Sequence, residues 1–569
     1  MAGGCAIYIG DNPMQQQTNP FGKDIANRGM FRALIEHGPW DDQLFLVHNR
    51  ADDAALAANL FGETPVPKPV RTTSVFNHGE IAARGTLFRG QSKLADLGWL
   101  RRETDDRAYS LVGLLHSLGP QAMRAYTAEV VTSPIEPWDA IVCTSPTVER
   151  HLRTLLEETS DYLASRLAEP GTRHRRPLPH LPVIPLGVDV PALAARADRN
   201  RRTEARAAFG VAEDAFVMLW LGRLSFFEKA YPQAMFAAAE ETARRTGRKV
   251  EFLMAGWFPD PERDRRTWAE AAALYAPSVT IRFLNGNDPA VLERIWAASD
   301  VFVSLVDNIQ ETFGITPIEA MAAGLPVVVS DWDGYRYTVR HGVTGFRIPT
   351  LIAPNGTGGL IASRHALGMD SYQHYVAQVA AHVAVSVQAT ADALCALAEN
   401  EDLARRMGAA AREHARATFD WPVVVAQYAA LFDELAAIRG SAEGYETAGA
   451  ARSNPVRSDP FGAFAGFASG VLGAATVFRA PARPAREDAE RHHRAALNNV
   501  TGVWRLTPQA TARIGAMVAE RDAMRGDQIA AALPGVPGDA LARHLAWMCK
   551  IGLLDWDVPP LIEVDRPDS

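Results

Sequence analysis

Residues 304–330, SLVDNIQETFGITPIEAMAAGLPVVVS, contain the pattern that decides the fold of this 569-residue chain. A short β-branched run precedes the stretch, and the apolar run at its end is short enough to be a buried strand. Between the two runs, Thr316 is a favourable N-cap and Pro317 suits the first helical position. Gly324, followed by Pro326, is a helix stop. A strand, a loop, a short helix and a second strand in this order are typical of a doubly wound α/β domain.

The loop before this helix has the features of an anion-binding site. Free N–H groups at a helix start attract phosphate, and here they belong to Phe313, Gly314 and Ile315. Two carboxylates, Glu311 and Glu319, flank the same place and would repel a lone phosphate. A sugar nucleotide resolves this conflict, because its diphosphate accepts from the N–H groups while its hydroxyls donate to the carboxylates.

Glu319 has a second interpretation that involves no ligand. It stands three residues after Thr316, so the two residues also fit a capping box in which Glu319 closes its own helix. The spacing alone does not distinguish a helix cap from a ligand-binding carboxylate.

Three motifs around this stretch resemble the retaining glycosyltransferases of GT-B family four, the glycosyl transferases group 1. They are E-x7-E with Phe-Gly after the first glutamate, E-A-M-A-x-G-x-P-V-V after the second, and D-G-x4-V-x2-G-x-T-G-F from Asp333. The resemblance implies an α/β fold of GT-B type, in which two Rossmann-like domains face a cleft. It also implies that Glu311 binds the donor sugar, that Glu319 binds the ribose, and that the sugar keeps its configuration on transfer.

Two basic residues of the second domain are candidates for the diphosphate. A strand pattern that ends at Gly222 is followed by Arg223 and Lys229, similar to the G-R-L…K site of the family. A diphosphate leaving group gains negative charge as the glycosidic bond breaks, and two cations directed at it stabilise that charge. Lys229 lies one residue later than in the usual pattern, behind Ser-Phe-Phe-Glu, so an ordinary surface lysine is the alternative for it.

Two further strand ends carry candidate site residues. The apolar strand 111–115 ends before His116, at the edge where α/β sheets bind ligands, although a structural histidine is the alternative. In the resembling family a histidine after the corresponding strand faces the donor sugar. The strand 250–256 ends at Gly256, and the Gly-Trp-Phe there is where the family places the nucleotide base.

Asp331 and Asp333 form a D-x-D motif, which elsewhere holds a metal ion for sugar nucleotides. Here the motif follows a strand of the GT-B type and precedes Gly334, so we expect a turn, and no metal ion or cofactor is predicted. The family has two glycines where this chain has Asp333 and Gly334. We expect this departure to reshape the sugar pocket.

Composition and charge limit the class of protein. Apolar residues make up 47% of the chain and charged residues 22%, as in ordinary globular enzymes, and a net charge of −8 argues against a polyanion as the main partner. The four cysteines are scattered, which favours neither a zinc site nor a disulfide framework. The start of the sequence shows no basic leader with a long apolar region, so a cytoplasmic location is expected. A basic run at 173–176 is expected to be a solvated loop.

Length and shifts in composition predict four segments. They are an N-terminal Rossmann-like acceptor-side domain (1–188), a C-terminal Rossmann-like nucleotide-sugar domain (189–440), a linker (441–495) and a small winged-helix-like module (496–569) with helices over 507–520, 527–533 and 539–554. Residues 351–386 of the second domain form an insertion that is either a lid or an acceptor wall. The uncharged residues 461–478, with glycines at four-residue spacing, are either a loose linker or a segment in peripheral contact with a membrane.

The sequence therefore predicts a retaining, metal-independent hexosyltransferase that moves a sugar from a UDP- or GDP-linked donor to an acceptor hydroxyl in glycan or polysaccharide biosynthesis. The acceptor is expected to be a glycan, a lipid-linked molecule or a small molecule. No nucleic acid is expected as a partner, because the tail is acidic. Two alternatives remain: a glucan polymerase similar to glycogen or starch synthases, and a non-catalytic sugar-nucleotide sensor whose tail binds a partner.

Overall fold

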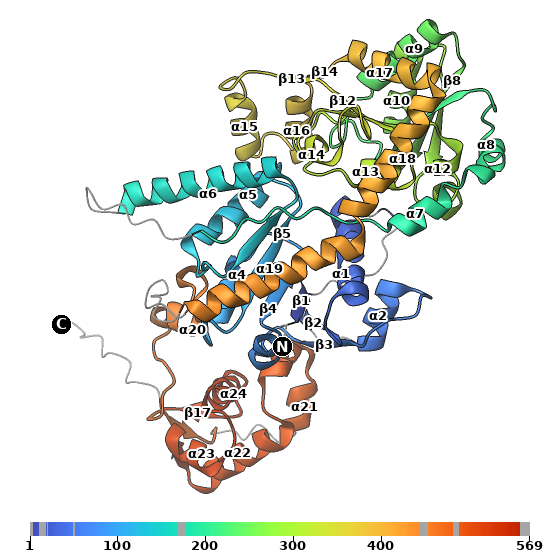
Figure 1. Cartoon of the computed structure of the whole chain (residues 1–569). Coiled ribbons are helices and arrows are strands. Elements are labelled where there is room, and N and C mark those ends of the chain that lie inside the picture. The colour runs from blue at the N-terminus through green and yellow to red at the C-terminus, as the bar shows by residue number, and fades with distance from the viewer. Residues whose placement is uncertain are drawn as a thin grey trace. The chain divides into compact units, whose positions relative to one another are not determined.

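The computed structural model describes residues 4–10, 19, 21–48, 52–167, 178–442, 453–481 and 489–557, so the basic run at 173–176 lies outside the described residues. The chain divides into two compact units, residues 1–453 and 454–569, and each is treated by itself below. The first unit contains two six-stranded parallel sheets flanked by helices (Figure 1).

The first sheet has the strand order β3-β2-β1-β4-β5-β6, with all neighbours parallel. Its strands are β1 (Cys5–Gly10), β2 (Gln43–Val47), β3 (Val70–Ser74), β4 (Thr86–Arg89), β5 (Ser110–Leu115) and β6 (Ala140–Cys143). Its helices are α1 (Gly22–His37), α2 (Asp53–Phe61), α3 (His78–Arg84), α4 (Ala95–Arg102), α5 (Gln121–Ala128) and α6 (Pro146–Leu167), with a 3-10 turn, η1 (Glu129–Thr132). Strands β2, β5 and β6 are buried along their whole length, which explains why they read as apolar runs.

The second sheet repeats the same topology, in the order β12-β11-β10-β7-β8-β9. Its strands are β7 (Phe216–Leu221), β8 (Val250–Gly256), β9 (Thr280–Asn285), β10 (Val301–Ser304), β11 (Val327–Ser330) and β12 (Gly345–Ile348). Its helices are α7 (Val190–Arg196), α8 (Arg202–Phe209), α9 (Gln233–Thr246), α10 (Arg263–Tyr275), α11 (Pro289–Leu292), α12 (Ile295–Ala298), α13 (Ile315–Ala322), α14 (Tyr335–Thr338), α17 (Val387–Glu399) and α18 (Glu401–Thr418), with a 3-10 turn, η2 (Arg199–Arg201). In each sheet the order reverses beside the first strand, as in doubly wound domains, so the predicted pair of Rossmann-like domains of GT-B type is confirmed.

The helix α13 starts earlier than the sequence indicates. Its N-cap is Gly314, with φ +82°, and its first residue is Ile315, so the assignment of Thr316 as N-cap is wrong. A side chain at position 314 would also collide with the Tyr335 ring, 1.9 Å from the position of a Cβ, so tertiary packing selects glycine as the cap. The helix has no side-chain cap, and the capping-box interpretation of Glu319 is therefore wrong as well.

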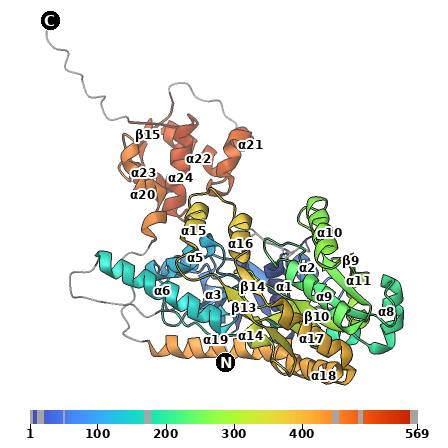
Figure 2. The ribbon, with the colours of Figure 1, turned by 90° about the horizontal axis from the view of Figure 1, so that it is seen from above.

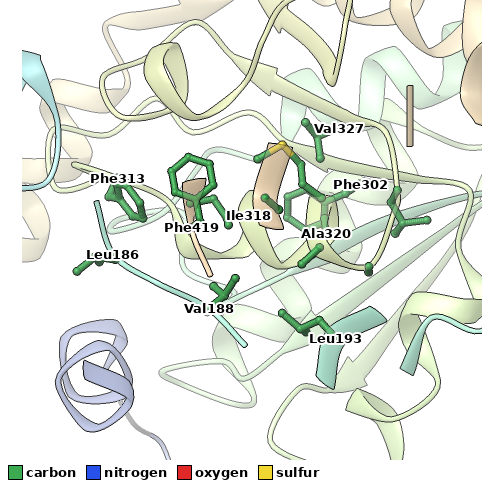
Figure 3. Close-up of a cluster of buried hydrophobic side chains, with 14 of the residues drawn as sticks. Leu186, Val188, Leu193, Phe302, Phe313, Ile318, Ala320, Val327 and Phe419 are labelled. Carbon is green, nitrogen blue, oxygen red and sulfur yellow. The ribbon is translucent and has the colours of Figure 1, made fainter. Parts of the chain in front are cut away.

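An apolar cluster holds α13 against the segment that joins the two domains. Figure 3 shows Ile318 and Ala320 of α13 among Leu186 and Val188 of that segment. The ring of Phe313, directly before the helix, lies 6.2 Å from the ring of Phe419, measured between ring centroids. Ile318 and Ala320 are fully buried, so the loop that precedes α13 is fixed at a rigid base.

The last helix of the first unit, α19 (Trp421–Ser441), crosses back onto the first domain, as expected (Figure 1). Its Tyr428 ring lies 5.5 Å from that of Phe88, and its Phe432 ring lies 6.2 Å from that of Trp40. By length and composition, α19 is also the one helix of the described residues that is apolar enough to cross a membrane. Its apolar stripe packs on the first domain, which is what a core helix does.

Residues 350–385 form the predicted insertion, between β12 and α17. It consists of β13 (Thr350–Ile352), α15 (Gly359–Ala366), α16 (Tyr372–Ala380) and β14 (Val383–Val385). The two strands pair antiparallel, so the two ends of the insertion lie side by side.

The second unit is a small helical module with a three-stranded antiparallel sheet in the order β16-β15-β17. It contains η3 (Pro455–Arg457), α20 (Pro460–Ala463), η4 (Ala465–Phe467), β15 (Val477–Arg479), α21 (Ala489–Arg494), η5 (Ala496–Trp504), α22 (Pro508–Glu520), β16 (Ala523–Arg525), α23 (Gly526–Ala532), α24 (Gly538–Lys550) and β17 (Asp555–Trp556). The helices α22, α23 and α24 overlap the three helices predicted over 507–520, 527–533 and 539–554.

The segment 441–495 is not simply a linker, because β15 lies inside it and forms the middle strand of the module's sheet. Phe478 of β15 is fully buried in the module core. Sequence patterns could not show this, since three residues form too short a run to identify a strand. Phe461 and Phe467 are exposed on two short helical turns, and the exposed Phe464 lies between them, so 461–478 is no continuous helix. Its contact with a membrane stays a prediction.

Candidate functional site

Glu311 lies in the loop between β10 and α13, at the carboxyl edge of the second sheet, and is paired with Lys229. The Lys229 Nζ lies 2.9 Å from Glu311 Oε2. Burial by itself would raise the pKa of Glu311, but Lys229 and the N–H groups of Phe313 and Gly314 outweigh it, so the pKa is lowered. Glu311 is therefore ionised, at the sheet edge where α/β domains bind ligands.

The N–H groups predicted to hold a phosphate interact with Glu311 instead. The Phe313 N–H donates to Glu311 Oε1 over 3.5 Å, and Gly314 also contributes a backbone hydrogen bond. The Phe313 side chain is buried in the core, and Ile315 is the first residue of α13. A diphosphate bound here would have to share these donors with Glu311.

Arg223 follows β7 and is held by a carboxylate and two aromatic rings. Its Nη1 lies 2.6 Å from Glu228 Oε2, and both side chains are nearly buried. The guanidinium lies 5.2 Å from the centre of the Phe21 ring and 5.7 Å from that of Trp257, within the range of cation–π attraction. These contacts fix the guanidinium in one position.

Close packing of the backbone requires glycine at position 256, and a φ of +150° favours it at position 222. A Cβ on Gly256 would lie 1.9 Å from the carbonyl oxygen of Gly222, so no side chain fits at the end of β8. The Gly222 N–H donates to Ala255 O, which joins the ends of β7 and β8. The glycines therefore bring the loops that carry Arg223 and Trp257 together.

Glu319 lies on α13 without a hydrogen-bond partner among the described residues. Burial raises its pKa from 4.5 to about 7, and the charge of Arg196 on α7 only partly offsets this. No hydrogen bond joins Glu319 to Glu311 or Arg223 in the described part of the chain. A partly buried carboxyl group without a hydrogen bond loses solvation when it ionises, and a pKa raised in this way is typical of functional sites.

His116 follows β5 at the carboxyl edge of the first sheet, as predicted. Its Nε2 lies 2.9 Å from Asn27 Oδ1, and burial lowers its pKa to about 4. The ring is therefore neutral at pH 7 and donates to Asn27, whose amide group in turn donates to Gly90 O over 3.1 Å. The carbonyl oxygen of His116 accepts a hydrogen bond from Thr312 Oγ1 at 2.6 Å, which places His116 next to the Glu311 loop.

Asp333 is more than part of a turn. It is one of two non-glycine residues of the described chain with positive φ, at +29°, and Ser145 Oγ at the start of α6 donates to its Oδ1 at 2.7 Å. Burial raises the pKa of Asp333 to about 7, and the nearby charge of Glu311 acts in the same direction. Asp331 lies 3.6 Å from Arg336 and from Arg347. Among the described residues, no group of three or more His, Cys, Asp or Glu side chains could hold a metal ion.

The two domains meet at this site. Thr312–His116 and Ser145–Asp333 are hydrogen bonds between them, and Thr147 Oγ1 lies 2.9 Å from the Tyr337 hydroxyl. Lys229 and Glu311 therefore come together, and the backbone of His116 lies at the adjoining Thr312. Arg223 lines a neighbouring pocket, and Glu319 lies on another part of α13.

Sequence reasoning missed two members of the site, Glu228 and Asn27, and the contact made by a third, Asp333. Glu228 is the last residue of the Ser-Phe-Phe-Glu stretch before Lys229, and sequence reasoning did not identify it as a site residue. The irregular spacing before Lys229 was the signal that this loop differs from the family pattern. Asn27 gave no local signal, because its partner lies 89 residues away. The sequence indicates for Asp333 a turn in the D-x-D motif and a departure from the family pattern, but not its partner Ser145, which belongs to the other domain.

Residues 201–352 match the glycosyl transferases group 1 family. The matched segment contains the Arg223 and Lys229 loop, the Glu311 loop and α13, so the resemblance inferred from the motifs is confirmed for this part of the chain. His116 and the first sheet lie outside the matched residues.

Several curated proteins are similar to parts of the chain. D-inositol 3-phosphate glycosyltransferase from Corynebacterium glutamicum is 27% identical over 253 residues, which are 44% of this chain and 51% of that protein. The protein of the same name from Geodermatophilus obscurus is 32% identical over 253 residues, 44% of this chain and 52% of that protein. The chain thus spans about half the length of the curated relatives it matches.

Two solved structures align with most of the chain. HepE from Anabaena in complex with UDP and glucose aligns with a TM-score of 0.47 at 15% identity, covering 76% of this chain and 99% of HepE. Sucrose-phosphate synthase from Thermosynechococcus elongatus aligns with a TM-score of 0.47 at 17% identity, covering 77% of this chain and all of that protein.

Proposed function

We propose that this chain is a retaining, metal-independent glycosyltransferase that moves a sugar from a nucleotide sugar to an acceptor hydroxyl. The observation that carries the proposal is the half-buried Lys229–Glu311 ion pair. It lies at the carboxyl edge of the second sheet, inside the segment that matches the glycosyl transferases group 1, and the first domain faces it with His116 and Ser145.

The two charged groups of this pair have different roles in the proposed reaction. The carboxylate of Glu311 accepts hydrogen bonds from hydroxyls of the donor sugar, and Lys229 stabilises the negative charge that grows on the leaving diphosphate. Arg223 supports the same diphosphate from the neighbouring pocket. Because Glu228 and Glu311 already bind these two cations, the diphosphate competes with protein carboxylates for them, which favours a ligand whose two phosphates contact both cations.

The acceptor binds on the side of the first domain in this proposal. His116 is neutral and held by Asn27, so in this proposal it lines the site of the donor sugar as a neutral group and not as a charged one. The relatives named for D-inositol 3-phosphate support a small hydroxylated acceptor, and a UDP- or GDP-linked donor agrees with the UDP bound in HepE. The departing phosphate takes the proton of the acceptor hydroxyl, since Glu311 is engaged with Lys229.

The proposal is tested by screening the purified full chain against UDP-, GDP- and ADP-sugars. A ligand at a hundredfold its Kd adds about 2.7 kcal/mol of stability, so a true donor raises the melting temperature clearly. The product is then identified by its anomeric configuration. Glu311→Gln should lower turnover by about a hundredfold, whereas Glu270→Gln on the exposed face of α10 should leave it unchanged.

Three results would overturn the proposal. They are the absence of any stabilising nucleotide sugar, binding without transfer to any acceptor, and a product of inverted configuration. Binding without transfer would instead favour the sensor, and a long glucan product would favour the polymerase.

A further inference from the structure

The insertion 350–385 packs where the two Rossmann-like domains meet. Gln121 Nε2 of α5, in the first domain, donates to Ala362 O of α15 over 3.2 Å, and Figure 2 shows these two helices side by side. On the second domain, the Tyr372 hydroxyl donates to Gln310 Oε1 at 2.8 Å, one residue before Glu311. The Tyr231 hydroxyl donates to Ala377 O over 3.2 Å, which anchors α16 beside the Lys229 loop.

The insertion is held rigid by its own contacts. Arg364 binds Asp370 through two hydrogen bonds of 2.8 and 3.0 Å, which close the turn between α15 and α16. The His365 ring stacks on the Tyr375 ring, with 4.8 Å between centroids and 14° between planes. Tyr375 is buried, so the start of α16 is fixed in position before any ligand arrives.

The first turn of α16 lines a pocket of about 510 Å³ that it shares with the Arg223 loop. The other walls come from the ends of β7 and β8 and from the residue before α1. The lining residues are Phe21, Arg223, Ser225, Phe227, Glu228, Trp257, Pro259, Arg263, Asp264, Ser371, Gln373 and His374. The pocket therefore lies over the carboxyl ends of the second sheet, and the insertion forms one side of it.

The chemistry of the walls fits a nucleoside diphosphate. Arg223 supplies a fixed cation for a phosphate, and the neighbouring Trp257 offers an aromatic face on which a base can stack. Gln373 and His374 supply donors and acceptors that can bind the polar edge of a base. The lining combines three aromatic rings with eight polar or charged side chains, which suits a ligand with a flat base and charged phosphates.

We propose that α16 is the specificity-determining wall of the nucleotide pocket, and that Gln373 and His374 determine which nucleoside diphosphate the chain binds. This inference rests on the proposed function and deepens it. Gln373 and His374 lie outside the segment that matches the glycosyl transferases group 1, so the specificity would come from this chain's own insertion.

The test measures the Kd values of UDP, GDP and ADP by calorimetry with the full chain. The double variant Gln373→Ala/His374→Ala should weaken the preferred nucleotide about tenfold and bring the three Kd values closer together, because two polar contacts to the base are lost. The matched control is His382→Ala, which removes an exposed histidine of the same insertion, outside the pocket. Arg223→Ala should weaken all three nucleotides alike, because it removes a contact to the shared phosphates.

The outcomes separate this inference from the proposed function. If the wild-type chain binds one nucleotide best and the double variant keeps the same three Kd values within about twofold, the role of α16 is refuted while the proposed function stands. If the wild-type chain binds none of the three, the proposed function fails and the inference fails with it. Because both side chains are exposed, the variants should fold, and an unchanged melting temperature confirms this.

Discussion

Replacing Glu319 by glutamine should make the protein more stable and its donor binding weaker at the same time. The Glu319 side chain is partly buried and makes no hydrogen bond within the described residues, and burial raises its pKa from 4.5 to about 7. A raised pKa means that the folded chain binds the proton more tightly than the unfolded chain. The group's contribution is therefore intact below about pH 4.5 and is lost as the pH rises through about 7.

The size of this effect follows from the two pKa values. At about 1.4 kcal/mol for each pKa unit, the difference corresponds to about 3 kcal/mol above pH 7 and to about 1 kcal/mol near pH 5. Glutamine has nearly the same shape and no charge to desolvate. Glu319→Gln should thus raise the free energy of unfolding by up to about 3 kcal/mol at pH 8 and much less at pH 5.

Unfolding in urea at both pH values, followed by tryptophan fluorescence, measures the stability of wild type and variant. Calorimetry at pH 8 measures the affinity for the nucleotide sugar, which should fall, because a charged acceptor of hydrogen bonds has become neutral. The control Glu270→Gln changes an exposed carboxylate of α10 and should move neither quantity. A variant that is no more stable than wild type at pH 8 would refute the claim that desolvation of Glu319 raises its pKa in the folded chain.

Three further predictions concern other parts of the chain. Lys229→Met should lower kcat/KM by at least about a hundredfold, because it removes a cation that stabilises the leaving diphosphate and leaves Glu311 without its partner. A loss below about threefold in steady-state kinetics would contradict this. Transfer activity should survive EDTA, and loss of activity that Mn²⁺ restores would show a metal dependence. Gly187→Ala should lower the melting temperature by several degrees, because its Cβ would lie 2.3 Å from the Trp421 ring. Gly440→Ala, with no neighbour within 4 Å, is the matched control and should not lower it.

Local chemistry explains what sequence reasoning could predict. The order of strands and helices around 304–330 was predictable, because buried parallel strands read as apolar runs and because Gly324 and Pro326 end a helix through their own backbone preferences. Arg223, Lys229 and Glu311 could be found because each follows a recognisable strand. In such cases the residues that carry the sequence signal lie within a few residues of the element that they predict.

Predictions failed where a partner distant in sequence decided the outcome. The N-cap of α13 is Gly314, because the Tyr335 ring excludes a side chain there, and a local rule favoured Thr316. A three-residue strand, β15, joins β16 and β17 across a large sequence separation, and so short a run carries no periodic signal.

The sequence by itself determined the class of fold and the identity of the charged residues at the sheet edges, because periodicity and turn chemistry act locally. Only the tertiary structure decided how those charges are paired. Arg223 forms an ion pair with Glu228, Lys229 forms one with Glu311, and Glu319 has no hydrogen bond within the described residues. Pairing depends on the path of the whole chain, since the energy between two charges is set by their distance and burial and not by their separation in sequence.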